Sequence, residues 1–216
     1  MTAPTLDRRW STYGRWALLN LLAFGILYPL VNWLTSVRTT RLDLYLDAES
    51  AIPFLPVWIW AYLSINILFV MPPLVLKEAD MPLLGRRMLA ATIAACAIFL
   101  ALPASLGFER ALPPDGVHQV IFEWLFHADA PHNLVPSLHV TYSTLCTFTY
   151  RAAATHGLLR ATWGLWLALI IVSTVLVHQH HVADVVGGLL LAAAIWRLVP
   201  PTKIFVEGSP RQSQAR

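Results

Sequence analysis

The octapeptide "VHQHHVAD" (177–184) places three histidines and an aspartate between two strongly apolar stretches. His180 and Asp184 are four residues apart, so they share one face if a helix begins there. The carboxylate would then hold one ring nitrogen of His180 and leave the other free to act as a base or a nucleophile. His181 lies three residues from Asp184 and offers an alternative pair, and the spacing alone leaves both pairs open.

A second polar segment, "PHNLVPSLHV" (131–140), places Ser137 and His139 at the start of another apolar stretch. The chain between His139 and His180 is long enough to cross a membrane and return. Each leg of about 18 to 20 residues rises 1.5 Å per residue and covers the roughly 30 Å hydrocarbon core. We therefore expect the two histidine segments to meet on one face of the protein.

A metal site is the competing interpretation of the same residues. Imidazole and carboxylate groups are ordinary zinc ligands, and the candidates are His178, His180 and Asp184 with His139 or His132. However, the HxHH spacing is not specific for zinc, and the HExxH pattern is absent. The sequence therefore favours a site without a metal.

The composition indicates which elements must position these groups. The chain has 216 residues, of which 57% are hydrophobic and 12% charged, and its mean hydropathy is +0.59. A soluble domain usually has about a quarter of its residues charged. The basic residues form no aromatic-interleaved stripe of the kind that binds nucleic acid. We expect an all-α membrane protein with a single domain over residues 1–200, followed by a polar, disordered tail over 201–216.

Apolar stretches and basic residues together predict a topology. Six stretches are long enough for membrane-spanning helices: 15–35, 55–76, 88–106, 136–152, 161–179 and 183–199. Basic residues favour the cytoplasmic side. With a cytoplasmic N-terminus, the outer loops contain only Arg38, Arg41 and Arg110, and the inner segments contain the others. The sequence therefore predicts a six-helix bundle with both termini inside and both histidine segments at the outer face.

Two outer loops, 36–54 and 107–135, are long enough to cover this face. Within the second loop, residues 117–126 carry apolar side chains at helical spacing together with Trp124. This pattern is typical of a helix that lies in the membrane interface.

The two histidine segments resemble the second and third signature motifs of the type 2 phosphatidic acid phosphatase superfamily. The matching stretches are "PSLH" (136–139) and "STVLVHQHHVADVVGG" (173–188). The third signature reads Ser-Arg, five residues, His, three residues, Asp, and Ser173, His180 and Asp184 fall on it in register. The resemblance implies a membrane-embedded enzyme that acts on lipid phosphates without a metal or another cofactor.

The resemblance also implies a role for each matched residue. His180 would be the nucleophile that forms a phosphohistidine, and Asp184 would orient it. His139 would protonate the leaving group and later activate water. The candidates for holding phosphate oxygens are Ser137, Asn133, Arg110, His178 and Arg41.

The chain departs from the family pattern in two places. Thr174 stands where the third signature has its arginine, and the first signature has no clean match. Arg110 in "FERALPP" (108–114) lies where the first signature is expected, and it is the best remaining phosphate clamp. Further positive charge near the phosphate is expected from Arg38, Arg41, His178 and His181.

The leading functional prediction is a phosphatase that hydrolyses a lipid phosphomonoester or diphosphate at the outer, periplasmic face of a bacterial inner membrane. A lipid phosphotransferase is the alternative within the same chemistry, because "ESAIPFLPVWIWAYLS" (49–64) resembles the inositol phosphorylceramide synthase-like branch. A small proton-relaying transporter or channel is the alternative from another class. The clustering of ionisable groups at one face favours an enzyme over a proton path.

Overall fold

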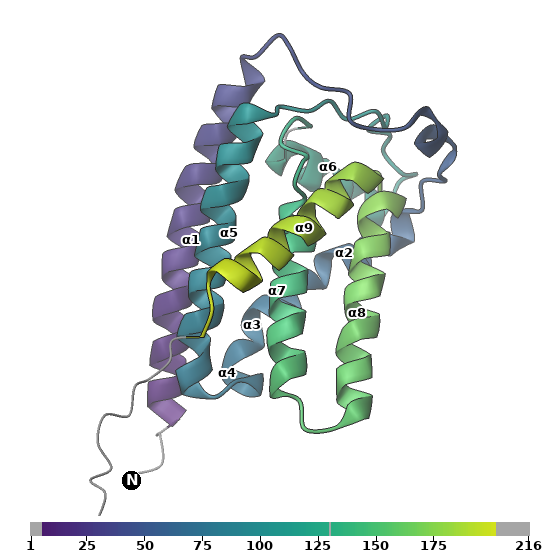
Figure 1. Cartoon of the computed structure of the whole chain (residues 1–216). Helices are drawn as coiled ribbons and strands as arrows, with labels where there is room; N and C mark the ends of the chain where they lie inside the picture. The colour runs from purple at the N-terminus through teal and green to yellow at the C-terminus, as the bar shows by residue number, and fades with distance from the viewer. Residues whose placement is uncertain (1–5, 130, 202–216) are drawn as a thin grey trace, which may run out of the picture.

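The computed structural model describes residues 6–129 and 131–201, and these residues fold into helices (Figure 1). The described part contains no strand, and a single isolated bridge joins Leu42 to Ala104. The prediction of an all-helical chain is therefore confirmed for this part. The predicted disordered tail, apart from Pro201, lies outside the described residues.

Five longer helices form the body of the molecule, and a broken helical segment and a shorter helix accompany them. The five are α1 (Leu6–Ser36), α5 (Met81–Ala101), α7 (Leu138–Ala153), α8 (Gly157–Leu176) and α9 (Val182–Leu198). The remaining elements are η1 (Asp47–Ala51), η2 (Pro56–Trp58), α2 (Ile59–Leu63), α3 (Ile65–Val70), α4 (Pro72–Val75), η3 (Glu78–Asp80) and α6 (Val117–Ala128).

Helices α1 and α5 lie side by side along most of their length (Figure 1). Their close approach depends on Gly85, because a Cβ atom there would lie only 2.5 Å from the Trp16 ring. The Asn20 side chain donates a hydrogen bond to the Gly85 carbonyl at 3.1 Å. Buried side chains from α1, α5, α7 and α9 share one hydrophobic core.

Three helical segments are long and apolar enough to span a membrane: Arg8–Ser36, Glu78–Ala101 and Gly157–Leu176. Large apolar side chains on α1 are exposed, including Leu21 at 68% and Ile26 at 64%. A continuous exposed apolar surface of this kind requires a cover in water, whereas lipid chains solvate it. These features are compatible with a membrane protein.

The boundaries of several helices differ from the predicted spans for identifiable reasons. The stretch 55–76 is interrupted at Ser64, between α2 and α3, and again at Met71, between α3 and α4. The second break precedes Pro72, because proline removes a backbone donor and crowds the preceding turn. The stretch 88–106 ends at Ala101, since Pro103 disfavours helical geometry at the residue before it. The amphipathic helix predicted over 117–126 is confirmed as α6.

Candidate active site

A tight turn between α8 and α9 fixes the backbone of His180. Helix α8 ends at Leu176, and the carbonyl of Thr174 accepts the backbone N–H groups of Gln179 at 3.1 Å and His180 at 3.0 Å. His178 adopts a left-handed conformation with φ of 55°, which reverses the chain. The turn is therefore anchored to the last turn of α8 by two hydrogen bonds.

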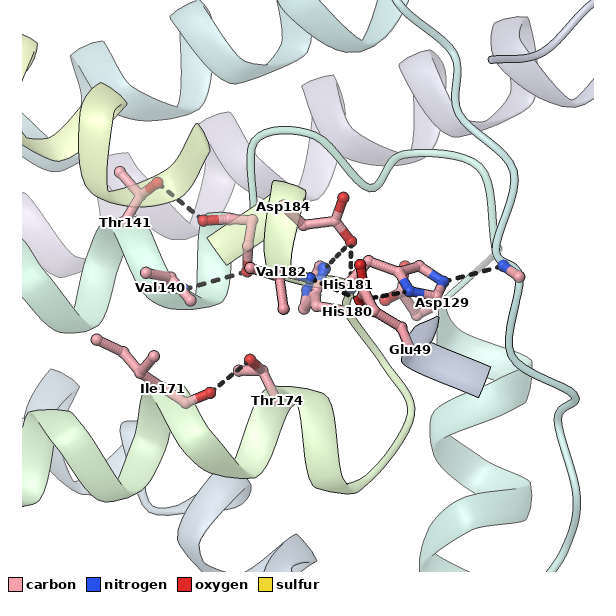
Figure 2. A network of polar contacts seen from close by, with 12 residues as sticks. Glu49, Asp129, Val140, Thr141, Ile171, Thr174, His180, His181, Val182 and Asp184 are labelled. Atoms are coloured by element: carbon pink, nitrogen blue, oxygen red, sulfur yellow. Dashed lines mark hydrogen bonds and ion pairs between the residues drawn. The ribbon is translucent and has the colours of Figure 1, made fainter. Parts of the chain in front are cut away.

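His180 and Asp184 form a buried pair at the start of α9 (Figure 2). Asp184 Oδ2 lies 3.3 Å from His180 Nδ1 and accepts the backbone N–H of His181 at 2.8 Å. Only 8% of the His180 side chain and 2% of the Asp184 side chain are exposed. In the part of the chain that the structure describes, no hydrogen bond engages His180 Nε2. The pair is thus arranged with Nδ1 held by the carboxylate and Nε2 available.

The two histidine segments are in direct contact through their backbones. The N–H of Ser137 donates to the Asp184 carbonyl at 3.0 Å, and the Thr141 hydroxyl donates to the Gly188 carbonyl at 3.1 Å (Figure 2 shows Thr141 and Asp184). A Cβ atom at Gly188 would lie 2.6 Å from the Ser137 carbonyl oxygen. The absence of a side chain at Gly188 therefore allows α9 to cross the start of α7 at this depth.

His139 has a defined ring plane and a defined tautomer. Its ring stacks on Tyr62, with 3.9 Å between the ring centroids and 15° between the planes. Its Nε2 lies 2.8 Å from the Tyr62 carbonyl oxygen. Because that oxygen can only accept, Nε2 carries a proton, and Nδ1 is the acceptor in the neutral ring. His139 lies two residues after Ser137, whose backbone N–H donates to the Asp184 carbonyl, so His139 and the His180–Asp184 pair belong to adjoining backbone segments.

A second carboxylate–histidine pair lies beside the first. His181 Nδ1 is 3.0 Å from Glu49 Oε2, and the same oxygen accepts the backbone N–H of Val182 at 3.0 Å. Glu49 Oε1 accepts the N–H of Leu46 at 3.1 Å. Burial alone would raise the pKa of Glu49, but these hydrogen bonds outweigh it and hold the pKa below its ordinary value. Glu49 therefore binds the loop 36–54 to the start of α9 as an ionised group.

The sequence left open which histidine pairs with Asp184, and the structure assigns His180. The side chain of His181 turns instead toward Glu49, and its Nε2 accepts the backbone N–H of Gly107 at 3.0 Å. A ring nitrogen that accepts a hydrogen bond is unprotonated, so His181 is neutral in this arrangement.

His178 and His181 belong to a stack of four rings. Phe108 lies between them, 4.0 Å from the His178 centroid and 4.1 Å from that of His181, and Tyr45 covers the other face of His181 at 4.9 Å. His178 Nε2 lies 3.0 Å from the Ile52 carbonyl oxygen. Burial lowers the pKa of His178 and favours its neutral form. In these contacts both imidazoles join residues 45–52 and 107–108 to the turn between α8 and α9. A contribution of His178 or His181 to the positive charge around a phosphate stays a prediction.

Two predicted phosphate ligands have structural roles. The hydroxyl of Ser137 is fully buried and accepts the backbone N–H of Val140 at 3.3 Å as the N-cap of α7. The side chain of Asn133 donates to Asn32 Oδ1 at 3.1 Å and accepts from the Thr35 hydroxyl at 2.8 Å. Asn133 therefore joins the loop 107–135 to the end of α1, and its role in phosphate binding stays a prediction.

The two predicted arginine ligands lie in different surroundings. Arg41 is exposed and donates to the Ser36 carbonyl at the end of α1. Arg110 Nη1 donates to the carbonyls of Phe126 at 3.2 Å and Asp129 at 2.7 Å, at the end of α6. Its Nε is buried and has no hydrogen-bond partner among the described residues. Burial lowers the pKa of Arg110 below its ordinary value, but an arginine stays charged at neutral pH.

Thr174 is buried, and its hydroxyl donates to the Ile171 carbonyl at 2.7 Å (Figure 2). Among the described residues, no cation forms a hydrogen bond with Thr174. Arg110 is the predicted phosphate clamp, and its guanidinium lies 5.0 Å from the centroid of the Phe126 ring. Phe126 packs in the same apolar cluster as Tyr62, the residue on which His139 stacks.

The described residues contain no group of three or more histidine, cysteine, aspartate or glutamate side chains placed to hold a metal ion. The structure therefore places His180 and Asp184 in contact with each other and Asp184 in contact with the backbone of Ser137. His139 lies in the first turn of α7, two positions after Ser137, and Arg110 is held at the end of α6. Asn133 and Arg41 lie at the end of α1. Comparison of the chain with protein-family models, with curated proteins and with solved structures found no match.

Proposed function

We propose that this protein is a membrane-embedded phosphatase that hydrolyses a lipid phosphomonoester or diphosphate through a phosphohistidine on His180. The buried His180–Asp184 pair, with Nε2 available, is the observation that carries the proposal. A histidine becomes a better nucleophile when a carboxylate holds its other nitrogen and stabilises the charge that develops on the ring. The motif resemblance in 136–139 and 173–188 supports the same chemistry.

In the first step, the lone pair of His180 Nε2 attacks phosphorus, and the bond from phosphorus to the leaving oxygen breaks. The ring becomes positively charged, and Asp184 stabilises it from the Nδ1 side across 3.3 Å. His139 enters this step with both ring nitrogens protonated: its Nε2–H donates to the Tyr62 carbonyl, and its Nδ1–H is transferred to the leaving oxygen, which leaves the neutral ring with Nδ1 as an acceptor. Phosphoryl transfer depends mainly on positioning and charge, which a fixed dyad provides.

In the second step, water attacks phosphorus on the opposite side from His180, and the bond between phosphorus and Nε2 breaks. His139 Nδ1 takes the proton from that water and so returns to its starting state in the next cycle. Stacking on Tyr62 fixes the ring plane of His139, so the acceptor nitrogen keeps one direction in both steps. Arg110 is the proposed source of positive charge for the phosphate, with its unpartnered Nε as the available donor.

The proposed setting is a six-span bundle with both termini in the cytoplasm and the histidines at the periplasmic face of a bacterial inner membrane. The distribution of basic residues supports this orientation, since the outer loops contain only Arg38, Arg41 and Arg110. In this proposal α2, α3 and α4 together form the second, broken span, and α7 and α9 form the fourth and sixth. Helix α6 lies in the interface beside the site, with Trp124 exposed at 64%.

Phosphate release from lipid phosphates by the purified protein tests the proposal. We expect release in the presence of a chelator and without added metal, and we expect the His180→Ala variant to release none. His118→Ala is the matched control, because His118 lies on α6 and contacts Trp60 at 3.2 Å instead of Asp184. Activity that survives in His180→Ala would contradict the mechanism.

A further inference from the structure

A basic hollow lies at the end of the molecule where the chain begins, away from the α8–α9 turn (Figure 1). It has a volume of about 710 Å³ and lies between the first turns of α1 and the segment that joins α4 to α5. Arg8, Arg9 and Thr12 form one wall, and residues 75–79 with Pro82 form the other. A smaller hollow of about 250 Å³ adjoins it and extends to Arg15.

Positive charge in this hollow exceeds negative charge. Arg8, Arg9, Arg15 and Lys77 line the two hollows, and Glu78 is the one carboxylate among their described lining residues. Glu78 Oε1 lies 3.7 Å from Arg8 Nε and accepts a hydrogen bond from the Thr12 hydroxyl at 3.3 Å. One carboxylate therefore faces four cations.

Arg9 provides a donor without an acceptor. Its Nη2 donates to the Leu76 carbonyl at 2.5 Å, which fixes the guanidinium against the wall. Its Nε is buried and has no hydrogen-bond partner within the described residues. A buried N–H of a charged group that has no acceptor raises the free energy of the folded protein. An anion in the hollow would accept a hydrogen bond from this N–H and so lower that free energy.

Apolar side chains continue outward from the charged groups. Leu74 is 66% exposed beside the hollow wall, and Trp10 is 48% exposed on α1. The two neighbouring candidate spans, Arg8–Ser36 and Glu78–Ala101, both begin at this level. The hollow therefore lies where lipid headgroups would meet the ends of these helices, with exposed apolar surface of α1 leading into the hydrocarbon region.

We propose that this hollow binds the phosphate headgroup of an anionic membrane lipid in the leaflet opposite the His180 site. Arg9 and Lys77 donate to the phosphate oxygens from the two walls, and Arg8 adds charge beside Glu78. Leu74 and Trp10 contact the upper part of the acyl chains. Basic pockets between transmembrane helices are a recurring form of anionic lipid recognition. This lipid is bound and not hydrolysed, because the hollow contains no histidine.

Native mass spectrometry of the full chain in detergent tests this site without reference to any phosphatase activity. Phosphatidylglycerol and phosphatidylcholine are titrated against the wild type, Lys77→Gln and the Arg9→Gln/Lys77→Gln pair. We expect phosphatidylglycerol to bind at least tenfold more tightly than phosphatidylcholine. Each basic group near an anionic headgroup is worth about a fivefold change in affinity, so we expect roughly fivefold and 25-fold weaker binding in the two variants.

Arg160→Gln/Arg197→Gln is the matched control, because both side chains are exposed, lie outside the hollow and belong to the same predicted side. We expect it to bind phosphatidylglycerol within twofold of the wild type. Equal affinity for the two lipids, or an equal loss in the control pair, would overturn the proposal. Displacement of the lipid by millimolar inorganic phosphate would overturn the lipid assignment in favour of a site for free anions. Lys77 is exposed, so the Lys77→Gln variant should fold and give a result even if the variant that also carries Arg9→Gln does not fold.

Discussion

Removal of the Glu49 carboxylate should destabilise the contact between residues 46–49 and the start of α9. Its two oxygens accept three hydrogen bonds, from Leu46 N, His181 Nδ1 and Val182 N, at 3.1, 3.0 and 3.0 Å. Glu49 and His181 are both buried, so Glu49→Ala leaves the His181 Nδ1–H without an acceptor and removes two further hydrogen bonds to a charged group. Each such loss costs about 1–3 kcal/mol, and we expect about 3–5 kcal/mol in total. For a chain of this length, this corresponds to a fall in Tm of roughly 10 °C.

Thermal unfolding in detergent measures this loss of stability, and two further variants test whether it comes from the buried hydrogen bonds of Glu49. Glu49→Gln keeps one acceptor oxygen, so we expect about half the loss. Asp47→Ala removes an exposed carboxylate two residues away, and we expect a change within about 0.5 kcal/mol. If Glu49→Ala and Asp47→Ala unfold at the same temperature, the reasoning from buried hydrogen bonds is refuted.

The same prediction has a defined pH dependence. The folded-state pKa of Glu49 lies below its ordinary value of 4.5, so its ionised form stabilises the fold above that pH. This stability is lost as the pH falls through the lowered folded-state pKa. The difference in Tm between the wild type and Glu49→Gln should therefore be constant near neutral pH and shrink toward zero in strong acid. A difference that grows on acidification would contradict the assignment of an ionised Glu49.

Three further outcomes follow from the site. Gly188→Ala would place a Cβ atom 2.6 Å from the Ser137 carbonyl oxygen and should lower the free energy of unfolding by about 1–3 kcal/mol. A Cβ atom at Gly25 meets no atom within 4 Å, so Gly25→Ala should leave that free energy unchanged or raise it. A Gly188→Ala variant as stable as Gly25→Ala would argue against the close crossing of α7 and α9. Asp184→Asn should lower kcat by roughly 10³-fold with little change in KM, and an unchanged kcat would exclude a catalytic role for the His180–Asp184 pair. Arg110→Gln should lower kcat/KM by about 30-fold, and an effect no larger than that of Arg41→Gln would exclude Arg110 as the phosphate clamp.

Hydropathy and spacing predicted the helical nature of the chain and the approximate location of its main helices. The predicted helix boundaries were wrong where a single residue interrupts or ends a helix. The stretch 55–76 is apolar on average, and a hydropathy average does not register the break before Pro72. The end of α5 at Ala101 depends on Pro103, and the turn after Leu176 depends on the left-handed conformation of His178.

Sequence spacing also located the residues that come together at the candidate site, but not their partners. Asp184 is four residues from His180 and three from His181, so the choice between them required tertiary structure. The decisive residue was Glu49, which lies 132 positions from His181 and draws that side chain away from Asp184. Its only signal in the sequence was its place in a loop on the same predicted face. The partners of Asn133 were missed for a related reason, since Asn32 and Thr35 lie about a hundred residues away in the sequence.

Trapping of the phosphoenzyme tests the central claim most directly. Purified protein mixed with a ³²P-labelled lipid phosphate and quenched within milliseconds should carry label that is lost in acid and retained in alkali, as expected for phosphohistidine. We predict this label in the wild type and its absence in His180→Ala, with peptide mapping that places it on the segment 177–184. Label that persists in His180→Ala, or label that is stable in acid, would contradict the account.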